Sequence, residues 1–392
     1  MVKLGEVCEI FGRIGFRGYT TKDIVQSPKD GAISLSPSNI QNGKMDYSKC
    51  TYISWYKYNE SPEIMISNGD ILLVKTGSSY GKSALVEHLP HEATINPQSV
   101  VLKNFKIYNK FLAYQIRTKR IKDEFDKFVS GTAIPTFSQA KLSEVLICLP
   151  PLEEQHRIVS ILDASFEKID ALKKNAEDNL KNAKALFQQV LTQELKPKDG
   201  WVEKKLGEVA TFSQGVQVPL PEQSLIEQEG YSRFLRIIDY TQGNEPPRYT
   251  LINDSKYKMF KDDIAIVRYG ASTGFICMGI EGILANNLFK ININDYHFIY
   301  TYYLSYVLKS EIFQGKIKEQ MNGAAMPAIS FGMIKNILLP FPINIEEQHR
   351  IVRTLDTLSE KCRRLEQVAQ QTIRECDALK QSILRQAFSG EL

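Results

Sequence analysis

The sequence has few of the features that mark metal sites, secretion or membranes. Its six cysteines are scattered and none forms a Cys-x-x-Cys pair, which excludes a zinc ribbon and a redox dithiol. No apolar run approaches the length of a membrane span, and the N-terminal stretch has no cleavable signal pattern. These features predict a reduced, cytoplasmic protein with no metal of its own and no membrane contact.

The chain also lacks a large excess of charge of either sign. The chain has 49 basic and 45 acidic side chains, a formal net charge of +4, which is too small to identify a nucleic-acid-binding protein. Hydrophobic residues make up 43% and charged residues 24%, a balance typical of folded domains and not of disordered chains. A length of 392 residues indicates two or more domains.

What the sequence does contain is a duplication with a period of about 193 residues. Leu-Gly-Glu-Val at 4–7 returns at 206–209, the segment 69–77 returns at 262–270, and the loop 130–135 returns at 322–327. Seven consecutive residues, Glu-Glu-Gln-His-Arg-Ile-Val, are identical at 153–159 and 346–352. Four motifs in one order are far beyond chance, and the period is too long for a solenoid. The chain is therefore two copies of one module.

The first part of each copy has a mixed α/β pattern. Residues 70–75 and 263–268 are short apolar runs bounded by Gly or Asp, which predicts buried strands. Residues 109–128 carry apolar side chains close to helical spacing, and residues 296–313 are the equivalent segment.

Each copy ends in a segment that predicts one long helix. Pro150 and Pro151 end the preceding strand, and Glu153 and Glu154 follow where a helix N-terminus favours acids. In the second copy, Asn344 with Glu347 fits a capping box. Heptad seams without Pro or Gly follow in both copies. They are formed by Leu162, Phe166, Ile169, Leu172, Ala176, Leu180, Ala183, Phe187 and Val190, and by Leu355, Leu358, Cys362, Leu365, Ala369, Thr372, Cys376, Leu379 and Ile383.

Two helices of matched length, each with one apolar stripe, can bury these stripes against each other. At ~1.5 Å per residue each is a rod of roughly 60–65 Å. We therefore predict an α+β fold in which two similar globular α/β domains are separated by two long antiparallel coiled-coil helices, with pseudo-twofold symmetry. The predicted domains are 1–150 and 198–343, and the helices are 151–197 and 344–392. The alternatives are separate coiled coils with other proteins, or ordinary core helices.

A rigid spacer between two related modules suits a ligand with two sites at a fixed separation, and duplex DNA is such a ligand. Between Ala93 and Lys122 there is no acid, which makes this stretch a candidate phosphate-facing surface. A solvated basic helix face explains it equally well. The basic residues are Lys103, Lys106, Lys110, Arg117, Lys119, Arg120 and Lys122.

A Gly-bracketed loop in each copy is the first candidate DNA contact. Residues 77–83 approach a P-loop but are one residue short of its spacing, and residues 270–276 keep both glycines and lose the Lys and Ser. A nucleotide site is therefore not predicted. What both copies keep is a basic residue followed by a polar loop, presented to DNA or forming an ordinary strand-to-strand turn. The candidate DNA-binding residues are Lys75, Ser78, Ser79, Tyr80 and Lys82, and Arg268, Tyr269, Ser272 and Thr273.

Other candidate DNA contacts lie outside this loop. Arg13, Arg17, Arg233 and Arg236 stand in loop-like or strand-edge contexts, and Arg can bind guanine bidentately or anchor phosphate. Thr132 lies in the small-residue loop 131–136, where glycine permits close backbone approach to a ligand. Surface ion pairs and simple turns are the alternatives.

The order of module, identical heptapeptide and long helix, given twice, resembles the specificity subunits of type I restriction–modification systems over nearly the whole chain. Supporting motifs are residues 4–7, 131–135, 149–155 and 387–392. The resemblance implies that each module reads one half of a bipartite DNA site, while the helices set the gap and dock two methyltransferase subunits. S-adenosylmethionine, ATP and Mg would then belong to those subunits and to restriction–translocase subunits.

The chain itself has no predicted catalytic residue or cofactor. Residues 96–99 lack the second proline and the aromatic residue of the adenine methyltransferase motif, and no Gly-x-Gly loop is present. Within the identical heptapeptide, a helix cap network or a partner interface explains the polar residues better than a catalytic cluster does. The rival hypotheses are a nucleotide hydrolase or nuclease, and a coiled-coil scaffold that never meets DNA. The candidate partner-binding residues are Glu154, His156, Arg157, Glu347, His349 and Arg350.

Overall fold

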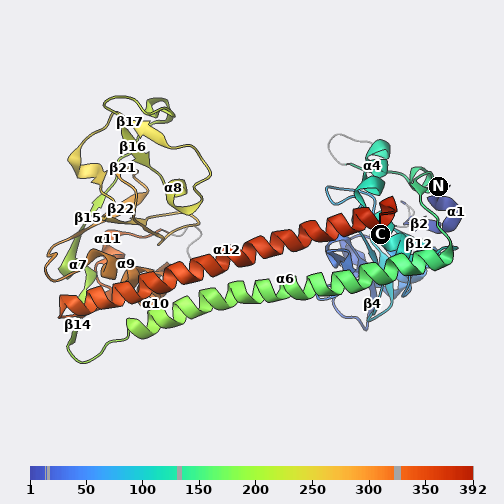
Figure 1. Cartoon of the computed structure of the whole chain (residues 1–392), viewed down its shortest axis with the longest axis horizontal. Coiled ribbons are helices and arrows are strands. Elements are labelled where there is room, and N and C mark those ends of the chain that lie inside the picture. The colour runs from blue at the N-terminus through green and yellow to red at the C-terminus, as the bar shows by residue number, and fades with distance from the viewer. Residues whose placement is uncertain (14, 16–17, 130–134, 322–327, 392) are drawn as a thin grey trace. The chain divides into compact units, whose positions relative to one another are not determined.

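The computed structural model describes residues 1–13, 15, 18–129, 135–321 and 328–391. It divides into two compact units, of which the first contains residues 1–176 and 371–392 and the second contains residues 177–370. Each unit therefore combines a module of one copy with segments of both long helices (Figure 1).

The first unit contains two main sheets. The first is fully antiparallel, in the order β10 (Ser83–Leu85), β9 (Ile71–Val74), β12 (Ser99–Lys103) and β2 (Glu9–Gly12). The second has the order β3 (Ile24–Val25), β7 (Thr51–Ser54), β4 (Gly31–Leu35), β11 (Ala93–Ile95) and β8 (Met65–Ile66), with β4 and β11 parallel. Two ribbons complete the module, β1 (Val2–Lys3) with β13 (Leu146–Ile147) and β5 (Ile40–Gln41) with β6 (Lys44–Met45).

The second unit repeats this topology, except that its described strands include no counterpart of β3 or of the ribbon β5 with β6. Its antiparallel sheet has the order β15 (Ala210–Gln214), β22 (Leu288–Ile293), β19 (Ile264–Val267) and β20 (Ile276–Cys277). Its other sheet has the order β17 (Arg248–Thr250), β16 (Ser232–Leu235), β21 (Gly282–Leu284) and β18 (Lys258–Met259), with β16 and β21 parallel. The ribbon β14 (Trp201–Lys205) with β23 (Leu338–Pro342) matches β1 with β13. The duplication predicted from the sequence is thus a duplication of fold.

The predicted strands and helices form the core of each module. Strands β9 and β19 are buried at every residue, as their apolar runs predict. The helical segment at 109–128 is two helices, because the Thr118 hydroxyl accepts a hydrogen bond from the Ile121 N–H and begins a new helix there. These are α3 (Asn109–Ile116) and α4 (Lys119–Phe128), matched by α9 (Thr301–Lys309) and α10 (Glu311–Met321). The short helices are α1 (Leu4–Val7), α2 (Trp55–Asn59), α5 (Gln139–Ser143), α7 (Leu206–Val209), α8 (Ile237–Thr241) and α11 (Phe331–Ile334).

The long helices are α6 (Leu152–Glu194) and α12 (Ile345–Ser389), and each contributes residues to both units. The Asn344 side chain caps α12 by accepting from the Glu346 N–H at 2.9 Å. The rest of the predicted capping box is wrong, because the Glu347 carboxylate accepts from the Arg350 guanidinium instead. None of the helices in the described ranges is long and apolar enough to cross a membrane.

The helix segments run antiparallel within the first unit. Lys173 of α6 pairs with Asp377 of α12 at 2.6 Å, and one turn earlier on α6 Asp170 pairs with Lys380, one turn later on α12. In the second unit, Arg350 near the start of α12 pairs with Glu194 at the end of α6 at 2.7 Å. The tail of each helix therefore packs beside the beginning of the other (Figure 1).

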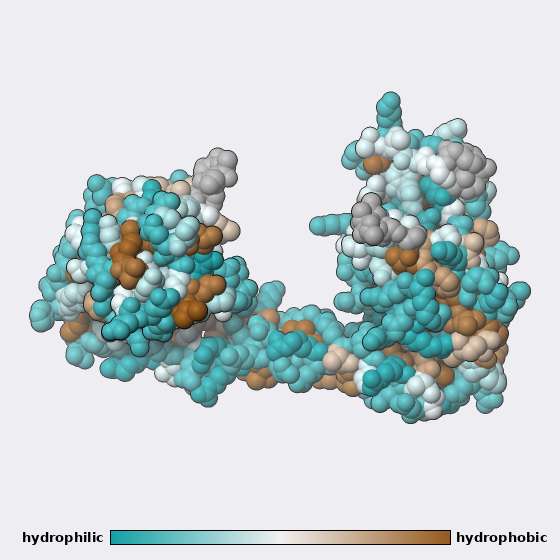
Figure 2. Space-filling model, turned by 90° about the horizontal axis from the view of Figure 1, so that it is seen from above, coloured by the Kyte–Doolittle hydropathy of each residue, from teal (hydrophilic) through white to brown (hydrophobic). Residues whose placement is uncertain are grey.

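The predicted seams are only half buried. Ile169, Ala176 and Ala183 on α6, like Cys362, Ala369 and Cys376 on α12, are at most 5% exposed. Three predicted seam leucines are instead exposed: Leu172 (55%), Leu365 (54%) and Leu379 (48%). The reason is geometric, since a pair of helices can bury only one stripe on each and a 3.6-residue turn drifts from a 3.5-residue repeat. Figure 2 shows brown, apolar atoms among the polar surface of the helices.

Candidate nucleic-acid interface

In each module the Gly-bracketed loop is a hairpin turn between two antiparallel strands. Gly77 and Gly81 have φ of 97° and 80°, and Gly270 and Gly274 have φ of 98° and 87°. Glycine adopts this left-handed region without steric cost, which explains why both copies keep both glycines. The Gly81 N–H donates to Val74 O at 2.8 Å and closes the turn between β9 and β10. The turn predicted as the alternative is therefore present, and it exposes its tip.

Tertiary structure brings a second predicted loop against this hairpin. The Gly77 N–H donates to Pro135 O at 2.9 Å, and the hydroxyls of Thr76 and Thr136 lie 2.8 Å apart. In the second unit the Ile329 N–H donates to Arg268 O at 2.8 Å. Thr132 and the loop core at 130–134 and 322–327 lie outside the described residues. Two motifs far apart in the sequence thus meet in both modules.

A helix supports the hairpin from one side. The Tyr80 hydroxyl donates to Asp126 of α4 at 2.6 Å, and this hydrogen bond raises the pKa of Tyr80. In the second unit the Gln314 side chain of α10 donates to Gly274 O at 2.9 Å. No sequence pattern singled out Asp126 or Gln314, because the contact between helix and hairpin depends on the fold.

The basic residue at the end of each buried strand stands beside the hairpin. Lys75 is half-buried, and burial lowers the pKa of its ammonium group, so a nearby anion would be favourable. The guanidinium of Arg268 lies over the rings of Phe289 (5.3 Å to the centroid) and Tyr269 (5.9 Å). Neither cation has an ion pair with an acid among the described residues.

The remaining hairpin residues differ in their exposure and in whether they already have a hydrogen-bond partner within the protein. Ser78 and Tyr269 are exposed, whereas Ser79 and Ser272 are half-buried. The Lys82 ammonium donates to Pro37 O at 3.4 Å, and the Thr273 hydroxyl donates to Gly270 O at 2.6 Å. The exposed tips differ between the modules while the turn that carries them is the same.

The candidate arginines outside the hairpins have internal partners. Arg13 is only 6% exposed and donates to Thr94 Oγ1 and Ile95 O. Arg236 donates to Asp239, Glu245 and Pro246 O. Because these guanidinium groups already have internal acceptors, we do not include Arg13 and Arg236 in the interface. Arg233 lies 3.8 Å from the same Asp239, and Arg17 lies outside the described residues.

The acid-free stretch at 93–122 is not one phosphate-facing surface. Lys103 pairs with Asp70 at 3.3 Å, Lys110 pairs with Asp163 at 2.9 Å, and Arg117 donates to Asn42 O. Acids distant in the sequence neutralise these lysines once the chain folds. Lys119, Arg120 and Lys122 remain exposed.

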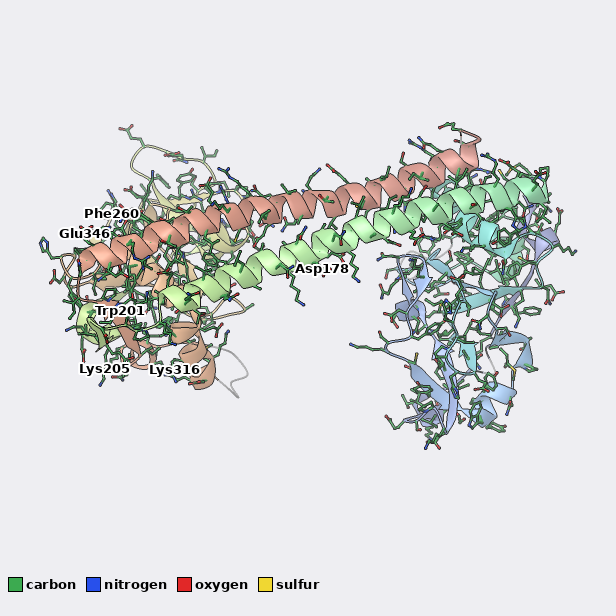
Figure 3. All side chains as sticks on the ribbon, turned by 60° about the horizontal axis from the view of Figure 1, so that its bottom comes forward. Asp178, Trp201, Lys205, Phe260, Lys316 and Glu346 are labelled. Carbon is green, nitrogen blue, oxygen red and sulfur yellow. The ribbon has the colours of Figure 1, made fainter. Side chains whose placement is uncertain are left out.

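The identical heptapeptide attaches each long helix to its module. Gln155 is 3% exposed, accepts from the Tyr108 N–H (3.0 Å) and donates to Pro150 O (2.8 Å). Gln348 is fully buried, accepts from the Tyr300 N–H (2.9 Å) and donates to Phe298 O (2.9 Å) and Pro342 O (3.0 Å). The pattern did not single out these glutamines. Each bonds the start of a long helix to a proline five or six residues earlier and to module backbone 47 to 50 residues earlier. Figure 3 labels Glu346, two residues before Gln348.

The six candidate partner-binding residues lie around these glutamines. His156 stacks on Tyr108 and His349 lies on Tyr300, with ring centroids 4.3 and 4.0 Å apart. Arg157 pairs with Glu154 at 2.7 Å, and the Arg157 guanidinium holds the pKa of that carboxyl below its usual value.

The second copy repeats this arrangement. Arg350 pairs with Glu347 at 2.8 Å and lowers the pKa of that carboxyl in the same way. The side chains of Arg157 and Arg350 are 47% and 43% exposed, so a cap network and an accessible surface coexist at each helix start.

The described residues hold no group of three His, Cys, Asp or Glu side chains placed to bind a metal ion. They form two related sheet modules and two long helices. Each module has a hairpin, a second loop that packs against it, and a helix that supports it. This is a duplicated-module protein that presents two related but different surfaces.

Comparison with known families identifies the module. A family model described as the type I restriction modification DNA specificity domain matches residues 1–182 and again residues 198–375. The chain belongs to this family.

Individual relatives cover almost the full chain. The EcoKI specificity subunit of Escherichia coli K12 is 26% identical over 95% of this chain and 85% of its own length. The StySPI specificity subunit of Salmonella potsdam is 24% identical over 91% and 82%. A chain from a type I restriction–modification assembly superposes with a TM-score of 0.74 at 22% identity, covering 100% of this chain and 97% of the other. At that identity the structural match supports the fold alone.

Proposed function

We propose that this chain is the DNA-reading subunit of a type I restriction–modification complex and that each module binds one half of a bipartite DNA site. One observation carries the proposal: the same hairpin, loop and helix recur in both modules, while the side chains that they present differ. A common scaffold with different tips suits two different half-sites. The modules are residues 1–150 and 198–343.

The chemistry of the hairpins fits a duplex ligand. Lys75 and Arg268 occupy matched positions at the strand end, and each would neutralise a phosphate or, for Arg268, bind guanine. Ser78, Ser79, Tyr80 and Lys82 in one module, and Tyr269, Ser272 and Thr273 in the other, would supply hydrogen bonds. We keep Thr132, Arg17 and Arg233 as candidates within this proposal.

Exposed leucines at equivalent positions of the two long helices indicate where a partner protein would bind. Leu172 and Leu365 occupy equivalent positions, as do Leu186 and Leu379, and all four are 45–55% exposed. Duplicated apolar side chains on α6 and α12 suit a protein that binds twice, which we propose to be the methyltransferase subunit. Glu154, His156, Arg157 and their counterparts Glu347, His349 and Arg350 would border the same contact.

In this proposal the chain is non-catalytic. Adenine methylation with S-adenosylmethionine, and ATP- and Mg-dependent cleavage, would reside in the methyltransferase and restriction–translocase subunits. The long helices would set the gap between half-sites. The scaffold alternative has no support from the family match, whose model describes a DNA specificity domain.

The test is DNA binding by the chain assembled with its methyltransferase. Methylation mapping first identifies the split site, and competition binding then compares that duplex with scrambled DNA over a salt series. We expect at least ~10³-fold preference for the split site and a steep salt dependence. Absence of any preference would overturn the proposal.

Two substitutions test which contact each module makes with DNA. Arg268→Ala is expected to weaken discrimination at one half-site by about 1–3 kcal/mol if it binds guanine. Lys75→Ala is expected to weaken binding to all sequences alike and to lower the salt slope by about one if it binds phosphate. Lys316→Ala, on the exposed side of α10 (Figure 3), is the matched control for lost positive charge.

A further inference from the structure

A small hairpin in the first unit reaches from the module to the long helices. Its strands are β5 and β6, and its tip residues Asn42 and Gly43 have φ of 52° and 75°. Ile40 at its base is fully buried, and the Asn39 side chain donates to Asp46 O and Lys49 O at 3.0 Å each. The base of the hairpin is thus held in the module, and this determines the direction in which its tip points.

The tip is seated on an arginine that is itself held in place. Arg117 donates to Asn42 O at 3.2 Å, and a Cβ atom on Gly43 would fall 2.1 Å from the guanidinium carbon. The guanidinium lies 5.8 Å from the ring centroid of Tyr114, whose hydroxyl donates to Asp163 of α6 at 2.6 Å. At position 43 the positive φ favours glycine, and a Cβ atom there would force the Arg117 guanidinium to shift.

One carboxylate then joins the hairpin to both helices. Asp170 of α6 accepts from Lys44 of the hairpin at 2.9 Å and from Lys380 of α12. Burial alone would raise the pKa of Asp170, but the hydrogen bonds from Lys380 and Lys44 outweigh it and hold the pKa below its usual value. These residues line a cavity of about 420 Å³. Asn42, Gly43, Lys44, Arg117, Asp170 and Lys380 together are called the hairpin clamp.

Among the described residues, the hairpin clamp occurs in the first unit and has no counterpart in the second. In the second unit the hydroxyl of Tyr306 donates to Asp356 at 2.6 Å, which repeats the bond from Tyr114 to Asp163. The strands described for that unit include no pair corresponding to β5 and β6. The tyrosine–aspartate bond therefore belongs to the common framework, as do the cores that each module shares with both helices. The hairpin adds a charged contact to α6 and α12 that the described strands of the second unit do not repeat.

We propose that the hairpin clamp fixes the orientation of the first module on α6 and α12, with Asp170 as a positioning residue that does not touch DNA. The inference rests on the proposed function. The first module already shares a hydrophobic core with α6 and α12, and the hairpin clamp adds charged contacts to both helices outside that core. These contacts would resist rotation of the module on the helices, so its reading hairpin would meet DNA at one position along the duplex. The hairpin clamp thereby makes the spacing of the first half-site stringent.

The first test uses two glycines with similar positive φ angles, 75° at Gly43 and 79° at Gly230. Gly43→Ala strains the turn and also collides with Arg117, whereas Gly230→Ala, at φ 79°, places its Cβ in open space. The full chain assembled with its methyltransferase is tested on duplexes whose gap is native, one base pair longer or one shorter. We expect Gly43→Ala to lower the preference for the native gap about tenfold, and Gly230→Ala to leave it as in the wild type. Equal gap preference in both variants would overturn the proposal.

The second test removes charge without adding bulk. Asp170→Asn is expected to relax the gap preference in the same direction. It should also speed amide hydrogen exchange at residues 376–389 of α12 in the full chain by at least tenfold. The triple exchange Lys44→Asp, Asp170→Lys and Lys380→Asp restores alternating charges, and rescue of both readouts supports positioning by the ion pairs. Unchanged exchange in Asp170→Asn would refute it.

The two proposals fail separately. If the wild-type complex shows no bipartite preference, the proposed function falls, while hydrogen exchange still decides whether the hairpin clamp holds α12. If the bipartite site is found and gap preference survives both variants, only the positioning role falls.

Discussion

The replacement of Gln348 by alanine isolates the junction between a long helix and its module. The side chain makes three hydrogen bonds to the backbone of Tyr300, Phe298 and Pro342, and it is fully buried. Alanine leaves one N–H and two C=O groups without that partner and opens a small void. At about 1 kcal/mol for each lost bond, the expected loss is about 3 kcal/mol.

The equivalent change in the other copy provides an internal scale. Gln155 makes two such bonds, to Tyr108 N and Pro150 O. Gln155→Ala should therefore cost about 2 kcal/mol, less than Gln348→Ala. Gln189→Ala, at an exposed position of α6, is the control and should stay within about 0.5 kcal/mol of wild type.

The chain offers a separate probe for each unit. Its two tryptophans are Trp55 in the first unit and Trp201 in the second; Trp201 (Figure 3) packs on the core beside Tyr303. Urea unfolding followed by fluorescence in a Trp55→Phe background reports on Gln348→Ala, and the Trp201→Phe background reports on Gln155→Ala. A loss below about 1 kcal/mol for Gln348→Ala, or a larger loss for Gln155→Ala, would refute the bond-by-bond reasoning.

Two further predictions concern the helices and the thiols. Ala369→Leu should destabilise the second unit by about 1–3 kcal/mol in urea, because that position is buried, whereas Val368→Leu on the exposed side should be neutral; equal effects would contradict the packing. Burial raises the pKa of Cys8 and Cys277 to about 12, so both stay protonated at pH 8. A thiol reagent should then modify the partly exposed Cys148 first, as mass spectrometry would show, and modification of the buried pair in folded protein would contradict this.

Much of the fold follows from short-range patterns. The strands at 71–74 and 264–267 lie within the predicted apolar runs, and α6 and α12 begin where Pro151 and Asn344 predict. Periodicity identifies such elements because it reflects which face each residue turns toward the core. It could not show that Leu172 and Leu365 stay exposed, since burial depends on what packs against the helix.

The candidate site divides in the same way. Glycines at 77, 81, 270 and 274 were recognisable because glycine is the residue type that adopts a positive φ most readily. Arg13 and Arg236 were not distinguishable from exposed arginines, because the acceptors that hold them are placed by strands and turns elsewhere. The sequence alone thus determined the duplication, the long helices and the glycines that bracket the two loops. Only the tertiary structure decided which charged and apolar side chains remain available, since partners distant along the chain meet through folding.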